Sequence, residues 1–400
     1  MTEQKNIQIT PDVSWIGVLD RDIVTFDVVM ETKYGTTYNS YFINAEKKTI
    51  IDTSKGRFWD TYLEKVKSVV DPAEIEYIVV NHTEPDHSGN LLNLLKLAPK
   101  ATVLGSSNAV RYLKDLMGTD FKYEIVKDGQ TLDLGNKTLR FIGAPNLHWP
   151  DSIYTYLEED RLLFTCDSFG SHYADERMWD DEVEDFDESF TYYFDVILKP
   201  FSKFILKAIE KIKPLRINAI LPGHGPLLRK NWRKYVDLSE KYALKYLEHP
   251  QRKYVFIPYV SAYNKTFLIG EAIAEGVRES GEVDTVLLDV EKVAIGELDM
   301  QMEKASGIIV GSPTINQNIL LPIYKLFAII NPLRDKGKLA GAFGSYGWSG
   351  EGAKLIENSL RNLKLDFFTV GLFFKFTPNE EELERARAYG RDFAAKILEA

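Results

Sequence analysis

Residues 74–90, EIEYIVVNHTEPDHSGN, form an apolar, strand-like run followed directly by a turn rich in metal-binding side chains. The turn carries four potential ligands, which are His82, Glu84, Asp86 and His87. Only 6 histidines occur in the 400 residues, so two in one turn are a marked concentration. Imidazole nitrogens and carboxylate oxygens are common ligands of divalent metals. The spacing therefore predicts a metal-binding turn at the end of a strand.

Three more potential ligands follow later predicted strands. They are His148 in APNLHWPDS, Asp167 in LLFTCDSFG and His224 in ILPGHGP. Gly or Pro lies near each of them and can shape the turn that carries the side chain. Two metals need more ligands than the four of the first turn, and a carboxylate such as Asp167 can bridge two cations with its two oxygens. The whole set therefore predicts a two-metal site.

Composition and charge favour a soluble globular protein. Hydrophobic residues make up 44% of the chain and charged residues 27%, which is typical of globular domains. A net charge of −10 without a dense Lys/Arg stripe argues against nucleic acid or an anionic membrane as partner. No apolar run approaches the roughly 20 residues of a membrane helix, and no signal-peptide pattern is present. With one cysteine, Cys166, no intramolecular disulfide is possible, and a cytoplasmic location is expected.

The length predicts two domains, and the chain changes its pattern near Pro250. Residues 1–250 mix short strands with helices, as in a β-rich α/β sandwich. The predicted strands there are residues 36–45, 48–53, 74–82, 101–107, 138–145, 161–167 and 217–225. Residues 251–400 alternate strand and helix regularly, which predicts a doubly wound parallel sheet. Its predicted strands are residues 253–260, 285–290, 306–314, 338–347 and 366–376.

Three turns after strands of the second half carry hydroxyl, glycine and aromatic residues: YVSAYNKT (259–266), GSPTINQN (311–318) and GSYGWSGEG (344–352). Such sheets bind ligands at the carboxyl ends of their strands. The helix beginning near Thr266 offers free N–H groups for a phosphate. The first turn lacks the Gly-Lys-Ser/Thr ending of a Walker loop, so hydrolysis of a nucleoside triphosphate is not expected. The dianion of a phosphate monoester needs only neutral hydrogen-bond donors at such a turn. Because Tyr346 and Trp348 offer flat faces, FMN is the predicted ligand.

The candidate flavin-binding residues lie in these three turns. They are Ser261, Ala262, Tyr263, Asn264, Lys265, Thr266, Ser312, Pro313, Thr314, Ile315, Asn316, Ser345, Tyr346, Gly347 and Trp348.

The order of the seven metal-ligand candidates resembles that of the metallo-β-lactamase fold. The usual loop of that fold is His-x-His-x-Asp-His, which binds zinc. Here Glu84 replaces the second histidine, and its hard oxygen shifts the preference toward iron. His-x-Glu-x-Asp-His is the pattern of the flavodiiron proteins (A-type flavoproteins), which the chain resembles over nearly its whole length. The resemblance implies a metallo-β-lactamase-like αββα sandwich, residues 1–250, followed by a flavodoxin-like FMN-binding domain, residues 251–400.

The same resemblance implies a ligand set for two irons. It assigns His82, Glu84 and His148 to the first iron, Asp86, His87 and His224 to the second, and Asp167 to a bridge between them. GSPT and GSYGWSGEG also resemble the FMN loops of the family. Asn264 departs from it, because the family usually has Gly there. Asparagine tolerates positive φ better than most residues, so the loop can keep its shape.

The function implied by the resemblance is that of a terminal reductase. FMN would collect electrons from an external donor and pass them to the diiron centre, which reduces O2 to water, NO to N2O, or both. The chain has no Cys-x-x-Cys pair, so the donor, rubredoxin or reduced F420, is expected to be a separate molecule. A head-to-tail homodimer, or a dimer of dimers, would bring the flavin of one subunit to the irons of the other.

Two alternative functions are a dinuclear zinc hydrolase with an accessory flavodoxin-like domain and an electron carrier that uses FMN alone. Glu84 and the flavin domain argue against the hydrolase. The complete ligand set argues against a vestigial metal pocket. His172 and Tyr193 are each either pocket-lining or structural, and Trp149 is either a contact between subunits or ordinary packing. The sequence does not choose between O2 and NO.

Overall fold

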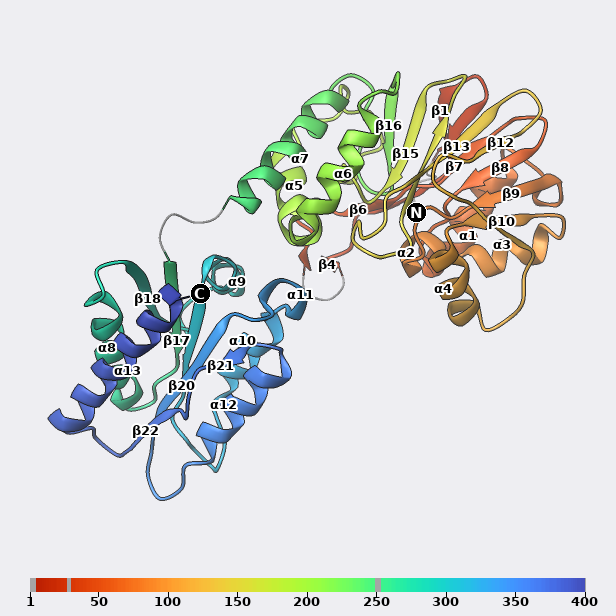
Figure 1. Cartoon of the computed structure of the whole chain (residues 1–400). Coiled ribbons are helices and arrows are strands. Elements are labelled where there is room, and N and C mark those ends of the chain that lie inside the picture. Colours follow the sequence, from red (N-terminus) through yellow and green to blue (C-terminus); the bar gives the residue numbers. More distant parts are fainter. Residues whose placement is uncertain (1–4, 27–29, 249–252, 400) are drawn as a thin grey trace. The chain divides into compact units, whose positions relative to one another are not determined.

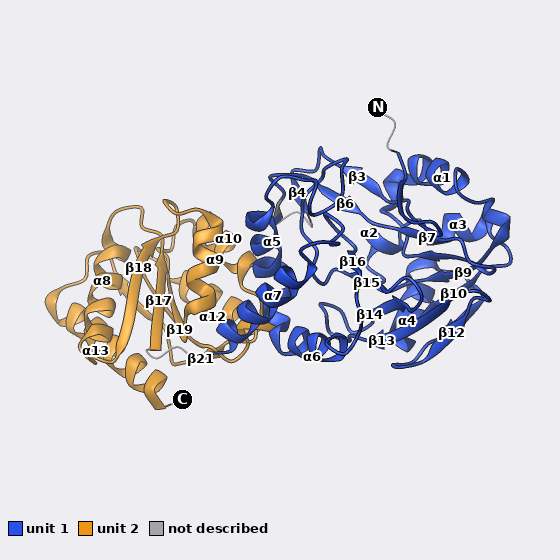
Figure 2. Cartoon of the chain, turned by 90° about the horizontal axis from the view of Figure 1, so that it is seen from above, with its two compact units in different colours: residues 1–248 blue, residues 249–400 orange. Residues whose placement is uncertain are grey.

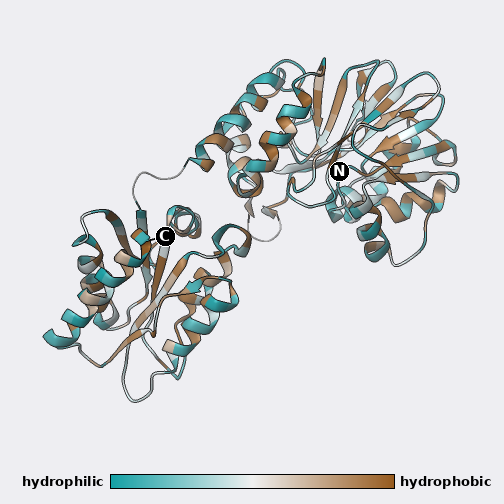
Figure 3. Ribbon diagram, in the orientation of Figure 1, coloured by the Kyte–Doolittle hydropathy of each residue, from teal (hydrophilic) through white to brown (hydrophobic). Residues whose placement is uncertain are grey.

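The computed structural model describes residues 5–26, 30–248 and 253–399 (Figure 1). The chain divides into two compact units, residues 1–248 and 249–400 (Figure 2). The predicted boundary between residues 250 and 251 lies outside the described residues. In both units the strands are mainly hydrophobic, and hydrophilic residues gather on the helices (Figure 3).

Unit 1 contains two mixed sheets, ordered β1-β2-β7-β8-β9-β10-β11 and β12-β13-β14-β15-β16. The first sheet comprises β1 (Ile7–Thr10), β2 (Val13–Trp15), β7 (Tyr41–Ile43), β8 (Lys48–Ile51), β9 (Ile75–Val79), β10 (Thr102–Gly105) and β11 (Tyr123–Ile125). The second comprises β12 (Thr131–Asp133), β13 (Thr138–Gly143), β14 (Ile153–Leu157), β15 (Leu162–Cys166) and β16 (Ala219–Pro222). Short pairs join β3 (Val18–Asp20) to β6 (Thr36–Tyr38) and β4 (Thr25–Phe26) to β5 (Met30–Glu31).

Helices cover the outer face of each sheet of unit 1. One hydrophobic cluster joins the first sheet to α1 (Trp59–Lys67), α3 (Leu91–Leu97) and α4 (Ser107–Met117). Another joins the second sheet to α5 (Asp187–Tyr193), α6 (Ser202–Ile212) and α7 (Trp232–Leu247). A third cluster, with Trp15, Phe141 and Phe164 at most 1% exposed, fills the space between the sheets. The predicted αββα sandwich is confirmed.

Several strands of unit 1 end at one edge of the sandwich. β13 and β15 are both antiparallel to β14, and β15 is parallel to β16. β13, β15 and β16 therefore run in one direction, and their carboxyl ends lead into the segments that carry the ligand candidates. Because strands that run in the same direction end at the same edge of a sheet, residues far apart in the sequence can meet there.

Unit 2 is a parallel sheet in the order β18-β17-β19-β20-β21, with β22 also paired to β20. Its strands are β17 (Lys253–Tyr259), β18 (Val283–Asp289), β19 (Gly307–Gly311), β20 (Leu339–Tyr346), β21 (Asp366–Phe367) and β22 (Leu372–Lys375). Its helices are α8 (Lys265–Arg278), α9 (Ile295–Lys304), α10 (Leu321–Ile329), α11 (Pro332–Asp335), α12 (Glu351–Asn362) and α13 (Glu380–Glu399). α8 and α13 pack on one face, and α9, α10 and α12 on the other (Figure 1). The strand order confirms the flavodoxin-like fold.

Two predicted strands are interrupted. Residues 36–45 form β6 and β7, which join different sheets, with Asn39 and Ser40 between them. Residues 366–376 form β21 and β22, and Val370 between them is 83% exposed. α9 is not predicted from the sequence, because it buries only Leu298 and Met302 and so has no clear apolar stripe.

Two glycines set the contact between α8 and α13. A Cβ atom at Gly276 would stand 1.9 Å from the carbonyl oxygen of Arg387, and one at Gly390 would stand 2.1 Å from that of Ile273. We expect Gly276→Ala to destabilise the protein by about 1–3 kcal/mol, because the helices would have to separate. Thermal and denaturant unfolding measure the loss.

Gly296→Ala in α9 is the matched control, because a Cβ there meets no atom of the described residues within 4 Å. Alanine in this helix should leave stability unchanged or raise it by about 0.5–1 kcal/mol. Equal stability of the two variants would contradict close packing of α8 on α13.

Candidate metal centre

The turn after β9 is held from both sides by buried hydrogen bonds. The carboxylate of Asp52, a residue with φ of 52°, accepts the N–H of Asn81 at 2.7 Å. The carbonyl oxygen of His87 accepts both the N–H and the hydroxyl of Thr53 at 2.7 Å. Helix α2 (Pro85–Ser88) begins directly after Glu84 and has proline at its first position, where proline is favoured. These bonds fix the direction of the side chains that follow.

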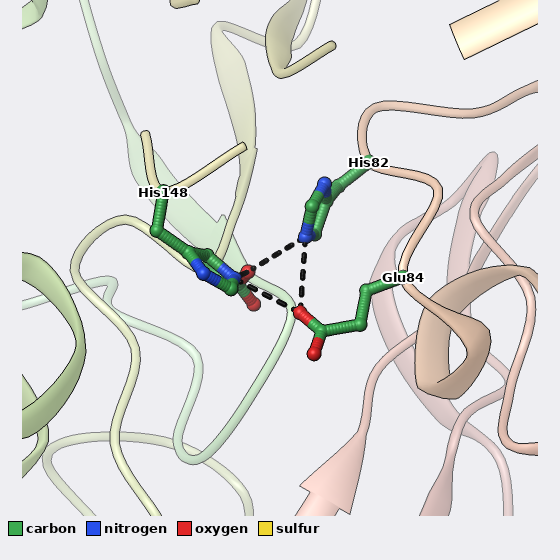
Figure 4. Close-up of side chains that lie close together, drawn as sticks. His82, Glu84 and His148 are labelled. Carbon is green, nitrogen blue, oxygen red and sulfur yellow. Dashed lines mark hydrogen bonds and ion pairs between the residues drawn. The ribbon is translucent and has the colours of Figure 1, made fainter. Parts of the chain in front are cut away.

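The first group of side chains contains His82, Glu84 and His148, which point toward one another (Figure 4). Glu84 Oε2 lies 3.2 Å from Nε2 of His82 and 2.9 Å from Nε2 of His148. His82 is fully buried, and His148 is 18% exposed. Two imidazole nitrogens and a carboxylate oxygen thus converge on one point.

The second group contains Asp86, His87 and His224. Asp86 Oδ2 lies 3.5 Å from Nε2 of His87 and 3.2 Å from Nε2 of His224. The three side chains are at most 5% exposed. Asp86 Oδ1 is buried and has no hydrogen-bond partner among the described residues. A buried charged oxygen without a partner is costly, so this group is suited to a cation.

Asp167 stands between the two groups and turns one oxygen to each. Its Oδ2 lies 2.9 Å from Nε2 of His148 and 3.4 Å from Nε2 of His82. Its Oδ1 lies 2.9 Å from Nε2 of His87 and 3.4 Å from Nε2 of His224. The structure thus brings all seven sequence-predicted ligand candidates together as two adjoining sets that share one carboxylate.

Charges compensate one another within this pocket. Burial alone would raise the pKa of Asp167, but the imidazoles of His87 and His148 hold that pKa well below its usual range. Burial opposes protonation of His82, yet the carboxylates of Asp151 and Glu84 raise its pKa to about 10. Bound cations would replace these protons as the balancing charge. The nitrogen and oxygen donors of these seven residues suit iron and other first-row metals, and the buried Cys166 sulfur lies within 4.8 Å of ligand atoms of His87 and Asp167.

Two further contacts orient the histidines and were not found from the sequence. Asp151 Oδ2 lies 3.3 Å from Nδ1 of His82 and accepts the N–H and hydroxyl of Thr83 at 2.7 and 2.8 Å. His224 Nδ1 donates to the carbonyl oxygen of Thr37 at 2.6 Å. Each contact directs Nε2 of its histidine toward the ligand groups. An acid near His148 was the available signal for Asp151, whereas a backbone carbonyl leaves no sequence signal.

His172 and Tyr193 line the side of the pocket next to His224. The His172 ring lies 4.9 Å from that of Tyr193 and 5.3 Å from that of His224. Its Nδ1 lies 2.9 Å from the hydroxyl of Thr36, while its Nε2 and the Tyr193 hydroxyl are buried without a hydrogen-bond partner among the described residues. Burial lowers the pKa of His172 to about 3, so the ring is neutral.

Trp149 and Cys166 are also neighbours of the ligands. The half-buried Trp149 ring meets that of His82 edge-on at 5.2 Å. Cys166 is 3% exposed and has φ of 46° at the end of β15, directly before Asp167. A left-handed residue at this strand end turns the chain into the pocket.

Unit 2 holds a cavity of about 320 Å³ at the carboxyl ends of its strands. The predicted flavin-binding residues that line it are Ala262, Tyr263, Lys265, Thr266, Pro313, Thr314, Ile315, Asn316, Ser345, Tyr346, Gly347 and Trp348. Gln317, Ser349 and Phe376 line it as well and were not predicted. Phe376 follows β22, and its aromatic ring near a strand end was the available signal.

Ser261, Asn264 and Ser312 are not among the residues that line the cavity. Ser312 is fully buried, and its hydroxyl accepts the N–H of Leu320 at 3.2 Å. The hydroxyl of Ser261 accepts the N–H of Phe267 at 3.4 Å. Asn264 has φ of 62° and precedes α8. The left-handed conformation that the sequence required of this asparagine is present.

Comparisons with known proteins agree with both units. Residues 36–225 match the family described as "ODP family beta lactamase", and residues 257–390 match the flavodoxin family. Flavo-diiron protein FprA2 of Clostridium acetobutylicum is 38% identical, over 98% of this chain and 99% of that protein. The chain belongs to the flavodiiron protein family. It is therefore an oxidoreductase, with FMN and a non-haem diiron centre as its cofactors.

Two further proteins are similar to this chain over nearly its whole length. A nitric oxide reductase of Moorella thermoacetica is 35% identical over 98% of this chain and 99% of its own length. The structure of rubredoxin oxygen:oxidoreductase from Desulfovibrio gigas matches with a TM-score of 0.74 and 28% identity, covering 99% of each chain. Within the described ranges, no helix has the length and apolar character needed to cross a membrane.

Asp151 offers a test of how the histidine positions depend on their outer contacts. We expect Asp151→Asn to weaken iron binding about 10- to 100-fold, because the charged acceptor at Nδ1 of His82 is lost. Iron content after competition with a graded chelator measures the change, and flavin content should stay constant.

Asp180→Asn is the matched control. Asp180 is 7% exposed and accepts the N–H groups of Arg229, Lys230 and Asn231, away from the ligand groups. Its variant should keep the iron affinity of the parent. Unchanged iron retention in Asp151→Asn would show that His82 needs no carboxylate behind it.

Proposed function

We propose that this protein passes electrons from an external donor through FMN to a diiron centre that reduces O2 to water, NO to N2O, or both. The observation that carries the proposal is Asp167, whose two oxygens face two separate groups of ligands. The printed names of two relatives, a nitric oxide reductase and a rubredoxin oxygen:oxidoreductase, support this choice of substrates.

The proposed ligands divide as the two groups do. His82, Glu84 and His148 would hold one iron, Asp86, His87 and His224 the other, and Asp167 both. When bound, two adjacent reducible irons supply electrons to a diatomic molecule. The acidic side chains balance the charge of the metals, and burial of the donors favours a closed, specific site.

The walls of this pocket supply hydrogen-bonding groups and exclude water. Burial raises the pKa of Tyr193 well above its usual value, so its phenol keeps the proton and can donate it in a hydrogen bond. The neutral His172 beside it adds a second polar atom, Nε2. Phe26 is 3% exposed and lies 4.6 Å from the ring of His172 and 5.4 Å from that of His224. Because His172 and His224 are each 2% exposed, this ring is part of a buried wall of the pocket.

The cavity of unit 2 is the proposed FMN site, with the lining residues given above. Tyr263, Trp348 and Phe376 are 81%, 86% and 62% exposed, so their rings are available to a flat ligand. Aromatic rings stack on such ring systems. The buried hydroxyls of Thr266 and Ser345, 3.0 Å apart, add polar contacts.

The donor, the assembly and the location belong to the same proposal. Rubredoxin or reduced F420 is the proposed electron donor, and the proposed assembly is a homodimer or a dimer of dimers in the cytoplasm. A head-to-tail arrangement would let the flavin of one subunit serve the irons of its partner. The zinc hydrolase alternative is not favoured, because family membership and Glu84 both point to iron.

The first test is anaerobic reduction of the protein, with metal content determined beforehand, followed by separate pulses of O2 and NO. We expect two irons and one FMN per chain, rapid flavin reoxidation by at least one gas, and water or N2O as product. Zinc in the site would favour the hydrolase. Slow reoxidation with hydrogen peroxide as product would favour the simple electron carrier.

Asp167→Asn tests the shared carboxylate. The variant removes the negative charge that faces both ligand groups, so the protein should retain less iron. Reoxidation of the flavin by O2 or NO should become about 100-fold slower, while chemical reduction of FMN proceeds as before. Asp195→Asn is the control, because its carboxylate is 47% exposed and pairs with Lys199 at the surface. Full turnover by Asp167→Asn would refute the shared role.

A further inference from the structure

The turn that carries His224 is fastened to a distant part of the chain. The turn is residues 222–225, at the end of β16, and its partner is residues 37–39, at the end of β6. Thr37 provides two of the hydrogen bonds. Its carbonyl oxygen accepts Nδ1–H of His224 at 2.6 Å, and its hydroxyl accepts the N–H of Gly225 at 2.7 Å. Thr37 and His224 are 187 residues apart in the sequence, so the fold alone creates this contact.

Asn39 adds three more bonds to the same turn and is 0% exposed. Its side-chain amide donates to the carbonyl oxygens of Pro222 at 2.8 Å and Gly225 at 3.0 Å, and its backbone N–H donates to that of Gly223 at 2.8 Å. Nε1–H of Trp15 donates to Oδ1 of Asn39 at 2.9 Å. Since an indole N–H can only donate and a carbonyl oxygen can only accept, all three side-chain contacts require one orientation of the amide.

The turn needs this support because glycine stands on both sides of the ligand candidate. A Cβ atom at Gly223 would stand 2.7 Å from Cε1 of His87, and Gly225 has φ of 75°. Both positions therefore require glycine, which has little conformational preference of its own. The bonds from Asn39 and Thr37 supply the missing rigidity from outside the turn.

The other ligand candidates are held by different contacts. Asp52 and Thr53 fix the turn after β9, as described above. The segment with His148 is closed by a hydrogen bond from the N–H of Asn146 to the carbonyl oxygen of Trp149 at 2.9 Å. The bonds of Asn39 go to the turn of His224 and to Trp15, so this side chain acts on the second ligand group through one of its three members.

We propose that Asn39 is a positioning residue that sets the affinity of the second group for its metal and leaves the affinity of the first group nearly unchanged. The inference rests on the proposed division of the ligands and deepens it. Nε2 of His224 lies 3.2 Å from Oδ2 of Asp86. A loosened turn moves this nitrogen away from its partners, whereas the first group keeps its geometry. The two metals thereby become separable by a residue that touches neither.

Asn39→Asp tests the proposal in the full-length protein. The carboxylate keeps the size of the side chain and the acceptor for Trp15, but it has no N–H group for the turn. The protein is loaded with iron and then equilibrated with a graded chelator. The variant should hold its second iron about 10- to 100-fold less tightly than the parent. The first iron and FMN should be retained as in the parent.

Electron paramagnetic resonance of the oxidised protein distinguishes this effect from general loosening of unit 1. A coupled pair of ferric ions gives no signal, whereas a single ferric ion gives the signal of high-spin iron. The signal should appear in Asn39→Asp at chelator concentrations at which the parent stays silent. A merely structural weakening would release both metals together and would not pass through this stage.

Thr37→Val loosens the same turn through a different contact. It removes the hydroxyl that accepts the N–H of Gly225 and keeps the carbonyl oxygen that orients His224. The variant should show the same selective loss of one iron, and it decides the question if Asn39→Asp does not fold.

Asn218→Asp is the matched control. Asn218 is exposed, lies before the other end of β16, and donates its amide to the carbonyl oxygen of Asp160 at 3.0 Å. This variant should keep both irons as tightly as the parent.

Two results in the deciding variant would overturn the role of Asn39 and leave the ligand set in place. One is release of both irons at the same chelator concentration, and the other is retention of both as in the parent. If the parent itself does not hold two irons per chain, the proposed division of the ligands fails, and the role of Asn39 fails with it.

Discussion

The carboxylate of Asp167 is the contact on which the metal pocket depends. It is 3% exposed and lies within 3.4 Å of a ring nitrogen of each of four histidines. A buried carboxylate is costly unless positive charge compensates it. Protonated imidazoles compensate it in the polypeptide alone, and cations would do so when metals bind. Removing Asp167 would therefore separate two ligand groups and also unbalance the charge of both.

The fold makes this contact possible by aligning strand ends. β15 delivers Asp167, β16 leads to His224 and β13 to His148, and these strands run in one direction. β9, from the other sheet, leads to the turn with His82. The apolar layer between the sheets, including Phe164 on β15, fixes the spacing of these ends. The packing of the core thus determines the distances between ligands that come from distant parts of the chain.

Most of the metal-ligand candidates could be predicted from short sequence motifs. The turn from His82 to His87 was predicted from its residue types and their spacing. The other three ligand candidates were predicted because each follows a predicted strand and so lies at the end of a sheet. Asp151 could not be assigned, because its role depends on a tertiary contact with His82. The break at Val370 and the weakly apolar α9 were also missed, since neither has a strong periodic pattern. Helix–strand alternation was sufficient to predict a flavodoxin-like parallel sheet, because its central strands β17, β19 and β20 are almost continuously buried.

The two units place different chemistry at the ends of their strands. Unit 1 gathers buried carboxylates around histidines, which makes a site that needs cations. Unit 2 presents a cavity lined by hydroxyl, amide and aromatic side chains, with Lys265 as the one charged residue among the described lining residues. A pocket of this composition suits a flat ligand with a few polar groups. In both units the strand order brings turns from distant parts of the chain to one edge of a sheet, so the same feature of the topology produces a charged site in one unit and a largely neutral site in the other.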